Sequence, residues 1–351
     1  MQEEYRNLPS NGDFDSLIAR YEEMLKSGDR YYFDVEDFEQ ILDYYIDVNH
    51  LGKALRAVKY AFNLHPYAIS LTIKKAQILL KDKNPKRALA TLNTIESLEA
   101  SNNELFITKG HANVMLGKYQ QAKKEYKKAL ELISDTDEAV DLLQNIAQTF
   151  QFVDEYNLAL RYLLRALELD EFNVFILQDL AFCYEKLDDP MNSLIFYKKY
   201  LDIDPFSEHT WYSIARIYRE MGEMEKAIEA YEFAIAINPR SNESVYEIAI
   251  LYEETFHYEK AIEYYQTYMV LDDESTEVLY NIANCYNQLD NYEKSLDYYR
   301  RVLKIDSYNP DIHHGIATIL FKQENFWDAL FYAKRATIID DENSSYFVLY
   351  G

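Results

Sequence analysis

Residues 208–241 read EHTWYSIARIYREMGEMEKAIEAYEFAIAINPRS. Apolar side chains recur in the first half at intervals of three and four residues, the spacing of one face of a helix. They are Trp211, Ile214, Ala215 and Tyr218. Gly222 interrupts that face, and a second one follows with Ala227, Tyr231 and Ala234. Asn238-Pro239 ends it, because proline cannot continue the helical hydrogen bonds. The stretch therefore predicts two amphipathic helices joined by a short turn.

The same pattern recurs along the chain with a period of 34 residues. It predicts nine units, which span 35–68, 69–102, 103–136, 140–173, 174–207, 208–241, 242–275, 276–309 and 310–343. Residues 137–139 are interpreted as an insertion between two units. The eighth place is small in eight of the nine units, and the twentieth is Ala or Ser in all nine. Small residues at fixed places are what closely packed helices require.

On these residues, the chain resembles the tetratricopeptide repeat family over residues 35–343. The resemblance implies an all-α fold, a right-handed superhelical α-solenoid of antiparallel helix pairs. It also implies a concave groove, lined by the first helix of each pair, and a protein or peptide partner. The RNA-binding pentatricopeptide repeats are a near alternative. The strict period of 34 and the net charge of −24 disfavour them.

The two ends depart from the repeat. Residues 1–34 form an amino-terminal segment in which about 13–27 predict an amphipathic helix that caps the first unit. Residues 344–351 predict the start of a truncated tenth repeat, with Phe347, Tyr350 and Gly351 in register. We therefore expect the chain to be a fragment of a longer repeat protein. The alternatives are a natural short cap and an exposed apolar end through which the chain self-associates.

Composition excludes several classes of protein. With 36 Lys and Arg against 60 Asp and Glu, the chain is a poor candidate for binding nucleic acid or an anionic membrane. It has no secretion signal pattern and no apolar run approaching ~18 residues, so we expect a cytoplasmic protein. Charge is uneven. Residues 69–136 carry 12 basic and 7 acidic residues, whereas residues 242–275 carry 1 basic and 9 acidic residues. The basic stretch is interpreted as a solvated face or as a second contact for an acidic partner.

No pattern in the sequence predicts catalysis, a cofactor or a metal. Cys183 and Cys285 occupy the same place in units three apart, which indicates core cysteines. His313 and His314 point ~100° apart on a helix and cannot share one metal. There is no glycine-rich phosphate loop and no nucleophile motif. We therefore expect a protein that is not an enzyme.

The resemblance places the second, fifth, sixth, ninth, twelfth and thirteenth positions of each first helix in the groove. One of these, the fifth, carries an aromatic ladder in the last four units, namely Tyr212, Tyr246, Tyr280 and His314. Beside it, Arg216 and Arg219 stand one turn apart and suit a ligand carboxylate. Three amides that suit a peptide backbone share one face, namely Asn281, Asn284 and Asn287. These nine residues are the predicted peptide-binding groove.

Two alternatives stay open for these residues. Tyrosine at the fifth place is common in the family without a ligand, and the Arg pair could merely neutralise Glu220, Glu243 or Glu247. The family's Lys and Asn carboxylate clamp is not reproduced in the first three units. The predicted function is a non-enzymatic protein-protein interaction scaffold. The alternative is a regulatory or carrier arm of a larger enzyme or secretion assembly whose active domain is missing from this chain.

Overall fold

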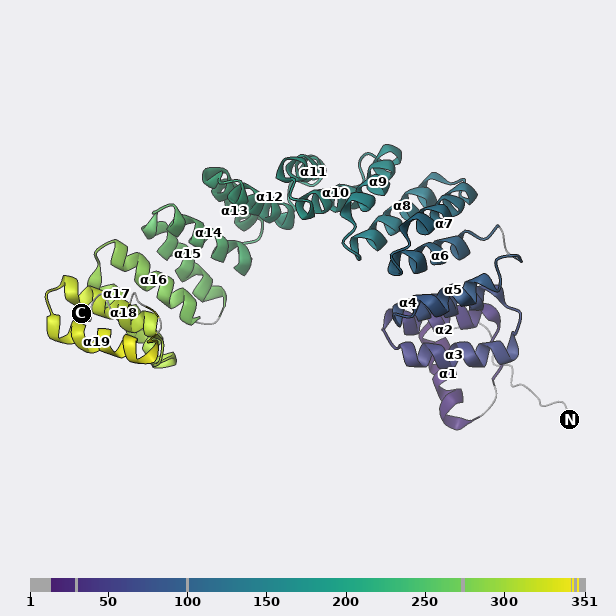
Figure 1. The fold of residues 1–351 in the computed structure, drawn as a ribbon, viewed down its shortest axis with the longest axis horizontal. Coiled ribbons are helices and arrows are strands. Elements are labelled where there is room, and N and C mark those ends of the chain that lie inside the picture. Colours follow the sequence, from purple (N-terminus) through teal and green to yellow (C-terminus); the bar gives the residue numbers. More distant parts are fainter. Residues whose placement is uncertain are drawn as a thin grey trace. The chain divides into compact units, whose positions relative to one another are not determined.

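The computed structural model in Figure 1 describes residues 14–28, 31–98, 101–272, 275–341, 343 and 346. These residues form nineteen helices and no strand, which confirms the predicted all-α fold. The chain divides into two compact units, one through Asp188 and the other from Asp189. Each is described by itself.

The first unit stacks helices in the order of the chain. They are α1 (Phe14–Ser27), α2 (Val35–Asp47), α3 (Leu51–Leu64), α4 (Ile69–Lys81), α5 (Pro85–Asn93), α6 (Asn103–Met115), α7 (Tyr119–Leu132), α8 (Thr136–Gln151), α9 (Tyr156–Leu169) and α10 (Val174–Lys186). Pairs pack as α2 with α3, α4 with α5, α6 with α7 and α8 with α9. Successive pairs contact one another, as a solenoid requires.

The second unit follows the same scheme. Its helices are α11 (Pro190–Ile203), α12 (Glu208–Glu220), α13 (Met224–Ile237), α14 (Asn242–Glu254), α15 (Tyr258–Leu271), α16 (Thr276–Gln288), α17 (Tyr292–Ile305), α18 (Pro310–Lys322) and α19 (Phe326–Ile339). Pairs form between α12 and α13, α14 and α15, α16 and α17, and α18 and α19. Each unit is thus an α-solenoid of paired helices.

The turn after each first helix has one conformation throughout. Its fifteenth-place residue has a positive φ between 54° and 77°. These nine residues are Asn49, Lys83, Gly117, Asp154, Asp188, Gly222, Phe256, Asp290 and Glu324. The left-handed residue lets the next N–H reach back to the helix, as His257 N does to the Tyr252 carbonyl at 2.8 Å. The turn therefore ends the first helix whether or not its residue is glycine.

One helix starts earlier than the repeat register predicts. The fourth 34-residue repeat is predicted to begin at residue 140, but α8 begins at Thr136. The Asp135 carboxylate accepts hydrogen bonds from the N–H groups of Asp137 and Glu138, both at 3.0 Å. This cap stabilises a helical turn at residues 137–139, so the predicted three-residue insertion lengthens α8 at its amino-terminal end.

At the amino-terminal end, α1 packs on α2 and buries Leu17, Ile18, Tyr21 and Met24. Asp13, where the predicted capping helix starts, lies outside the described residues. At the other end only Tyr346 of residues 344–351 is described. Phe347, Tyr350, Gly351 and the predicted start of a tenth repeat therefore lie outside the described part.

Candidate functional site

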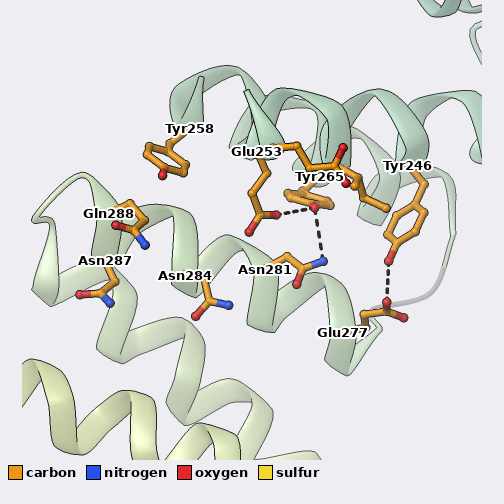
Figure 2. Close-up of a pocket in the computed structure, with 11 residues that line it drawn as sticks. Tyr246, Glu253, Tyr258, Tyr265, Glu277, Asn281, Asn284, Asn287 and Gln288 are labelled. Carbon is orange, nitrogen blue, oxygen red and sulfur yellow. Dashed lines mark hydrogen bonds between the residues drawn. The ribbon is translucent and has the colours of Figure 1, made fainter. Parts of the chain in front are cut away.

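The second unit contains an open cavity of about 660 Å³. Helix α14 contributes Tyr246, Ile250, Glu253 and Glu254, and α15 contributes Tyr258 and Tyr265. Helix α16 contributes Glu277, Asn281, Asn284, Asn287 and Gln288. Figure 2 shows the α16 side chains lying opposite those of α14 and α15. We call these eleven residues the α14–α16 groove.

Helical periodicity explains why these side chains line one surface. On α14, Tyr246, Ile250 and Glu253 are spaced by four and three residues, and on α16 Asn281, Asn284 and Gln288 are spaced by three and four. Residues at that spacing share one helix face. The opposite faces are apolar and buried, with Val245, Ile248 and Ala249 on α14 and Val278, Ile282 and Ala283 on α16. Core packing therefore turns the polar faces toward the cavity.

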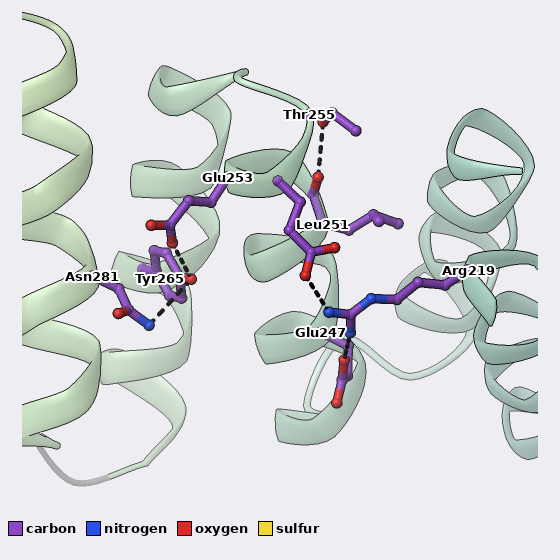
Figure 3. Close-up of polar contacts among 8 residues, drawn as sticks. Arg219, Glu247, Leu251, Glu253, Thr255, Tyr265 and Asn281 are labelled. Carbon is purple, nitrogen blue, oxygen red and sulfur yellow. Dashed lines mark hydrogen bonds and ion pairs between the residues drawn. The ribbon is translucent and has the colours of Figure 1, made fainter. Parts of the chain in front are cut away.

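Tyrosine hydroxyls hold two of the carboxylates. The Tyr265 hydroxyl donates to Oε2 of Glu253 at 2.7 Å and accepts from Nδ2 of Asn281 at 3.3 Å. The Tyr246 hydroxyl donates to Oε1 of Glu277 at 2.7 Å. Figures 2 and 3 show the Tyr265 hydroxyl between Glu253 and Asn281. Burial raises the pKa of the Glu253 carboxyl, and the neighbouring charge of Glu254 raises it further.

The amides of α16 differ in how they are satisfied. Oδ1 of Asn284 accepts a 2.5 Å hydrogen bond from the Tyr299 hydroxyl. Oδ1 of Asn287 is shielded from solvent and accepts no hydrogen bond from the described residues. A shielded acceptor without a donor is uncommon in folded proteins. Because solvent does not reach this atom, a ligand N–H cannot reach it in this conformation either.

Arg219 forms ion pairs within the chain. Its Nη1 lies 2.7 Å from Oε2 of Glu247 and its Nη2 lies 2.5 Å from Oε1 of Glu254, both on α14. Figure 3 shows the Arg219 guanidinium beside the Glu247 side chain. Arg219 therefore ties α12 to α14 and neutralises carboxylates of its own chain. The pairing with Glu247 is the alternative raised above, and the use of Arg219 as a receptor for a ligand carboxylate stays a prediction.

The other four predicted residues are not among those that line the α14–α16 groove. Nε of Arg216 lies 3.9 Å from Oε1 of Glu220, and the Tyr212 ring packs edge-on against Tyr231 with centroids 5.7 Å apart. Tyr280 lines a smaller cavity of about 180 Å³. The His314 ring lies 5.3 Å from that of Tyr346.

Four of the nine predicted residues line the α14–α16 groove, namely Tyr246, Asn281, Asn284 and Asn287. Sequence reasoning missed its carboxylates. Their places in the 34-residue repeat are the twelfth for Glu253, the thirteenth for Glu254 and the second for Glu277. The family resemblance assigns all three places to the groove, so the register was the signal that could have found them.

The described residues offer no other chemical centre. No group of three or more His, Cys, Asp or Glu side chains among them is placed to hold a metal ion. Cys183 and Cys285 are buried free thiols, and burial raises the pKa of Cys183 to about 11. In the same part of the chain, no helix combines the length and apolarity needed to cross a membrane.

Comparison with solved structures finds repeat proteins of low identity. The crystal structure of MamA is 21% identical with a TM-score of 0.45, and the match covers 48% of this chain and 92% of MamA. A tetratricopeptide repeat protein from Parabacteroides merdae is 17% identical with a TM-score of 0.44, and the match covers 71% of this chain and 97% of that protein. The structure of pilF from Pseudomonas aeruginosa is 16% identical with a TM-score of 0.43, and the match covers 61% of this chain and 96% of pilF. TM-scores below 0.5 give no basis for transferring a partner or an activity.

No curated protein matches the chain. Family models do match it. Residues 210–241 and 276–309 match one tetratricopeptide repeat model, and residues 104–136 and 140–173 match another. These matches lie in both units, and the helices of each unit follow the 34-residue period. The chain is thus a tetratricopeptide repeat protein over these residues, and the matches support a protein-interaction scaffold.

Proposed function

We propose that this protein is a non-enzymatic scaffold that binds an extended segment of a partner protein along the α14–α16 groove. The observation that carries the proposal is the continuous face of aromatic, amide and carboxylate side chains around the 660 Å³ cavity. Aromatic walls bury ligand side chains, and amides pair with a peptide backbone. A folded helix needs no such backbone partners, so an extended segment is the better guest.

The lining supports binding of protein rather than catalysis or nucleic-acid binding. None of the described lining residues is a Ser, Cys, Lys or His that could act as a nucleophile with its base. None is a Lys or Arg that could contact phosphate. Glu253 and Glu277 are held by tyrosine hydroxyls rather than aimed at a reactive group.

Selection from a library of random dodecapeptides displayed on phage tests the proposal. The full chain is immobilised as wild type and as the groove variant Asn281→Ala/Asn284→Ala. The matched control is Gln266→Ala/Thr267→Ala, two exposed α15 side chains outside the groove lining. Circular dichroism checks that each variant keeps its helices.

We expect clones that bind wild type and control equally and lose about tenfold or more in affinity on the groove variant. Clones that bind the groove variant as tightly as wild type would contradict the proposal, because their binding would not depend on this surface.

A further inference from the structure

The α14–α16 groove is lined by carboxylates without a cation of its own. Glu253, Glu254 and Glu277 line it, and no Lys, Arg or His is among its described lining residues. The surrounding residues 242–275 carry only one basic residue against nine acidic ones. The electrostatic potential in the cavity is therefore negative.

The three carboxylates differ in how far the chain neutralises them. Glu254 pairs with Arg219 from α12. Glu253 and Glu277 receive hydrogen bonds only from neutral tyrosine hydroxyls, and neither forms an ion pair with a described residue. A phenol stabilises a carboxylate but leaves its charge in place. The half-buried Glu253 thus keeps a partly desolvated charge, and burial raises its pKa.

Tyrosine rings in the groove also suit a cationic group. Tyr246 and Tyr258 line the cavity and are partly exposed, and the faces of such rings attract ammonium and guanidinium groups.

From this lining we infer that the partner segment is basic, with a lysine or arginine side chain that enters the α14–α16 groove between Glu253 and Glu277. This inference rests on the proposed function, and it specifies the chemistry of the guest. It also reverses the charge expected from Arg216 and Arg219, because Arg219 is already paired within the chain. An acidic segment would meet three carboxylates and no cation along the lining.

The display experiment gives a first reading on charge. Among clones whose binding depends on the groove, we expect Lys and Arg to exceed Asp and Glu by about threefold or more relative to the naive library. Groove-dependent clones that show no such excess would overturn the basic-segment inference and leave the proposed function standing. If no clone depends on the groove, the proposed function fails and the inference fails with it.

A pair of charge variants separates local from general attraction, since a chain of net charge −24 attracts any basic peptide. Glu253→Gln/Glu277→Gln removes two carboxylates from the groove. Glu259→Gln/Glu263→Gln removes two from the exposed face of α15, outside the groove lining. A synthetic peptide from a groove-dependent clone is titrated against each by fluorescence anisotropy at about 150 mM salt.

We expect the Kd to rise about tenfold or more for the groove pair and less than about twofold for the control pair. Equal losses for the two pairs would show general attraction and overturn the inference. An unchanged Kd for the groove pair would overturn it as well. Thermal melts that match wild type exclude unfolding as the cause.

Discussion

The two compact units share one helix-pair frame but treat their charges differently. In the first unit, Nζ of Lys74 lies 2.6 Å from Oδ1 of Asp43, and Nζ of the buried Lys109 lies 2.8 Å from Oε2 of Glu96. In the second unit the carboxylates of the α14–α16 groove meet tyrosine hydroxyls, and only Glu254 has a cation. The two units thus share a frame and differ in how the side chains on their exposed helix faces are paired.

The buried places of the two units are nearly interchangeable. Gly110 and Ala249 hold the eighth place of their repeats, and Tyr126 and Tyr265 hold the twenty-fourth. All four are buried. Small residues beside large rings build the same pair of helices in both units.

The largest effect we expect is a change in stability with pH. It should depend more on a histidine of the first unit, His111, than on one of the second unit, His314. Nε2 of His111 on α6 is shielded from solvent, and burial lowers the pKa of this side chain to about 4. Between pH 6.5 and 4 the unfolded chain binds a proton that the native histidine does not, so stability falls as the pH falls. This histidine alone should reduce the free energy of unfolding by roughly 3 kcal/mol over that range.

The measurement is urea unfolding at several pH values for wild type, His111→Gln and His314→Gln. His314 in the second unit is half-buried and burial lowers its pKa also, so it serves as the matched histidine. We expect His111→Gln to flatten the pH dependence more than His314→Gln. Parallel curves for wild type and His111→Gln would refute the assignment.

The next effect tests the likeness of the buried places. A Cβ at Gly110 would overlap the fully buried Tyr126 ring, so Gly110→Ala should destabilise the first unit by about 2 kcal/mol through overpacking. Ala249→Gly should cost the second unit about 1 kcal/mol, because glycine lowers helix propensity. Differential scanning calorimetry on both variants checks the order. A Gly110→Ala protein as stable as wild type would show that Tyr126 has room to move.

How far the sequence predicts the frame can be judged at the turns. Gly222 marks a turn because glycine suits positive φ. Phe256 occupies the same place with φ of 63°, although nothing in its chemistry favours that conformation. The period of 34 therefore predicted where the helices lie better than local residue preferences did. The period placed an insertion at residues 137–139, but it did not reveal that the Asp135 cap makes these residues part of the first turn of α8.

The third prediction compares two tyrosines at the twenty-fourth place of adjacent repeats. The Tyr265 hydroxyl joins Glu253 to Asn281, whereas the Tyr231 hydroxyl is shielded and has no hydrogen-bond partner among the described residues. Tyr265→Phe should lower the free energy of unfolding by about 1 kcal/mol, and Tyr231→Phe should leave it unchanged or slightly raised. Chemical denaturation measures both. Equal losses would mean that the network contributes no stability.

The smallest effect concerns the turn beside the groove. Phe256 has positive φ, and 76% of its side chain is exposed. Phe256→Gly should therefore raise the free energy of unfolding by about 0.5–1 kcal/mol, because glycine adopts this conformation without a steric penalty. Gly222→Ala at the same place of the preceding repeat should lower it by a similar amount. A stability loss in Phe256→Gly would point to a packing role for the phenylalanine ring.

The candidate site was harder to predict than the frame. Tyr246 and the asparagines were found because their spacing is visible in the sequence. The pairing of Arg219 depends on side-chain distances across two helices, which no spacing supplies. Glu253 and Glu277 could have been predicted, because the family resemblance assigns their places in the repeat to the groove. An acidic residue on a helix is most often solvated, however, and so gives a weak signal.

Hydrogen-deuterium exchange with a groove-selected peptide tests the central claim most directly. The claim is that the second unit, through α14 and α16, provides the binding surface. We predict that the peptide slows exchange in residues 242–254 and 276–288 and leaves residues 69–81 and 103–115 of the first unit unchanged. Slowed exchange in those first-unit helices with none in α14 and α16 would contradict the account.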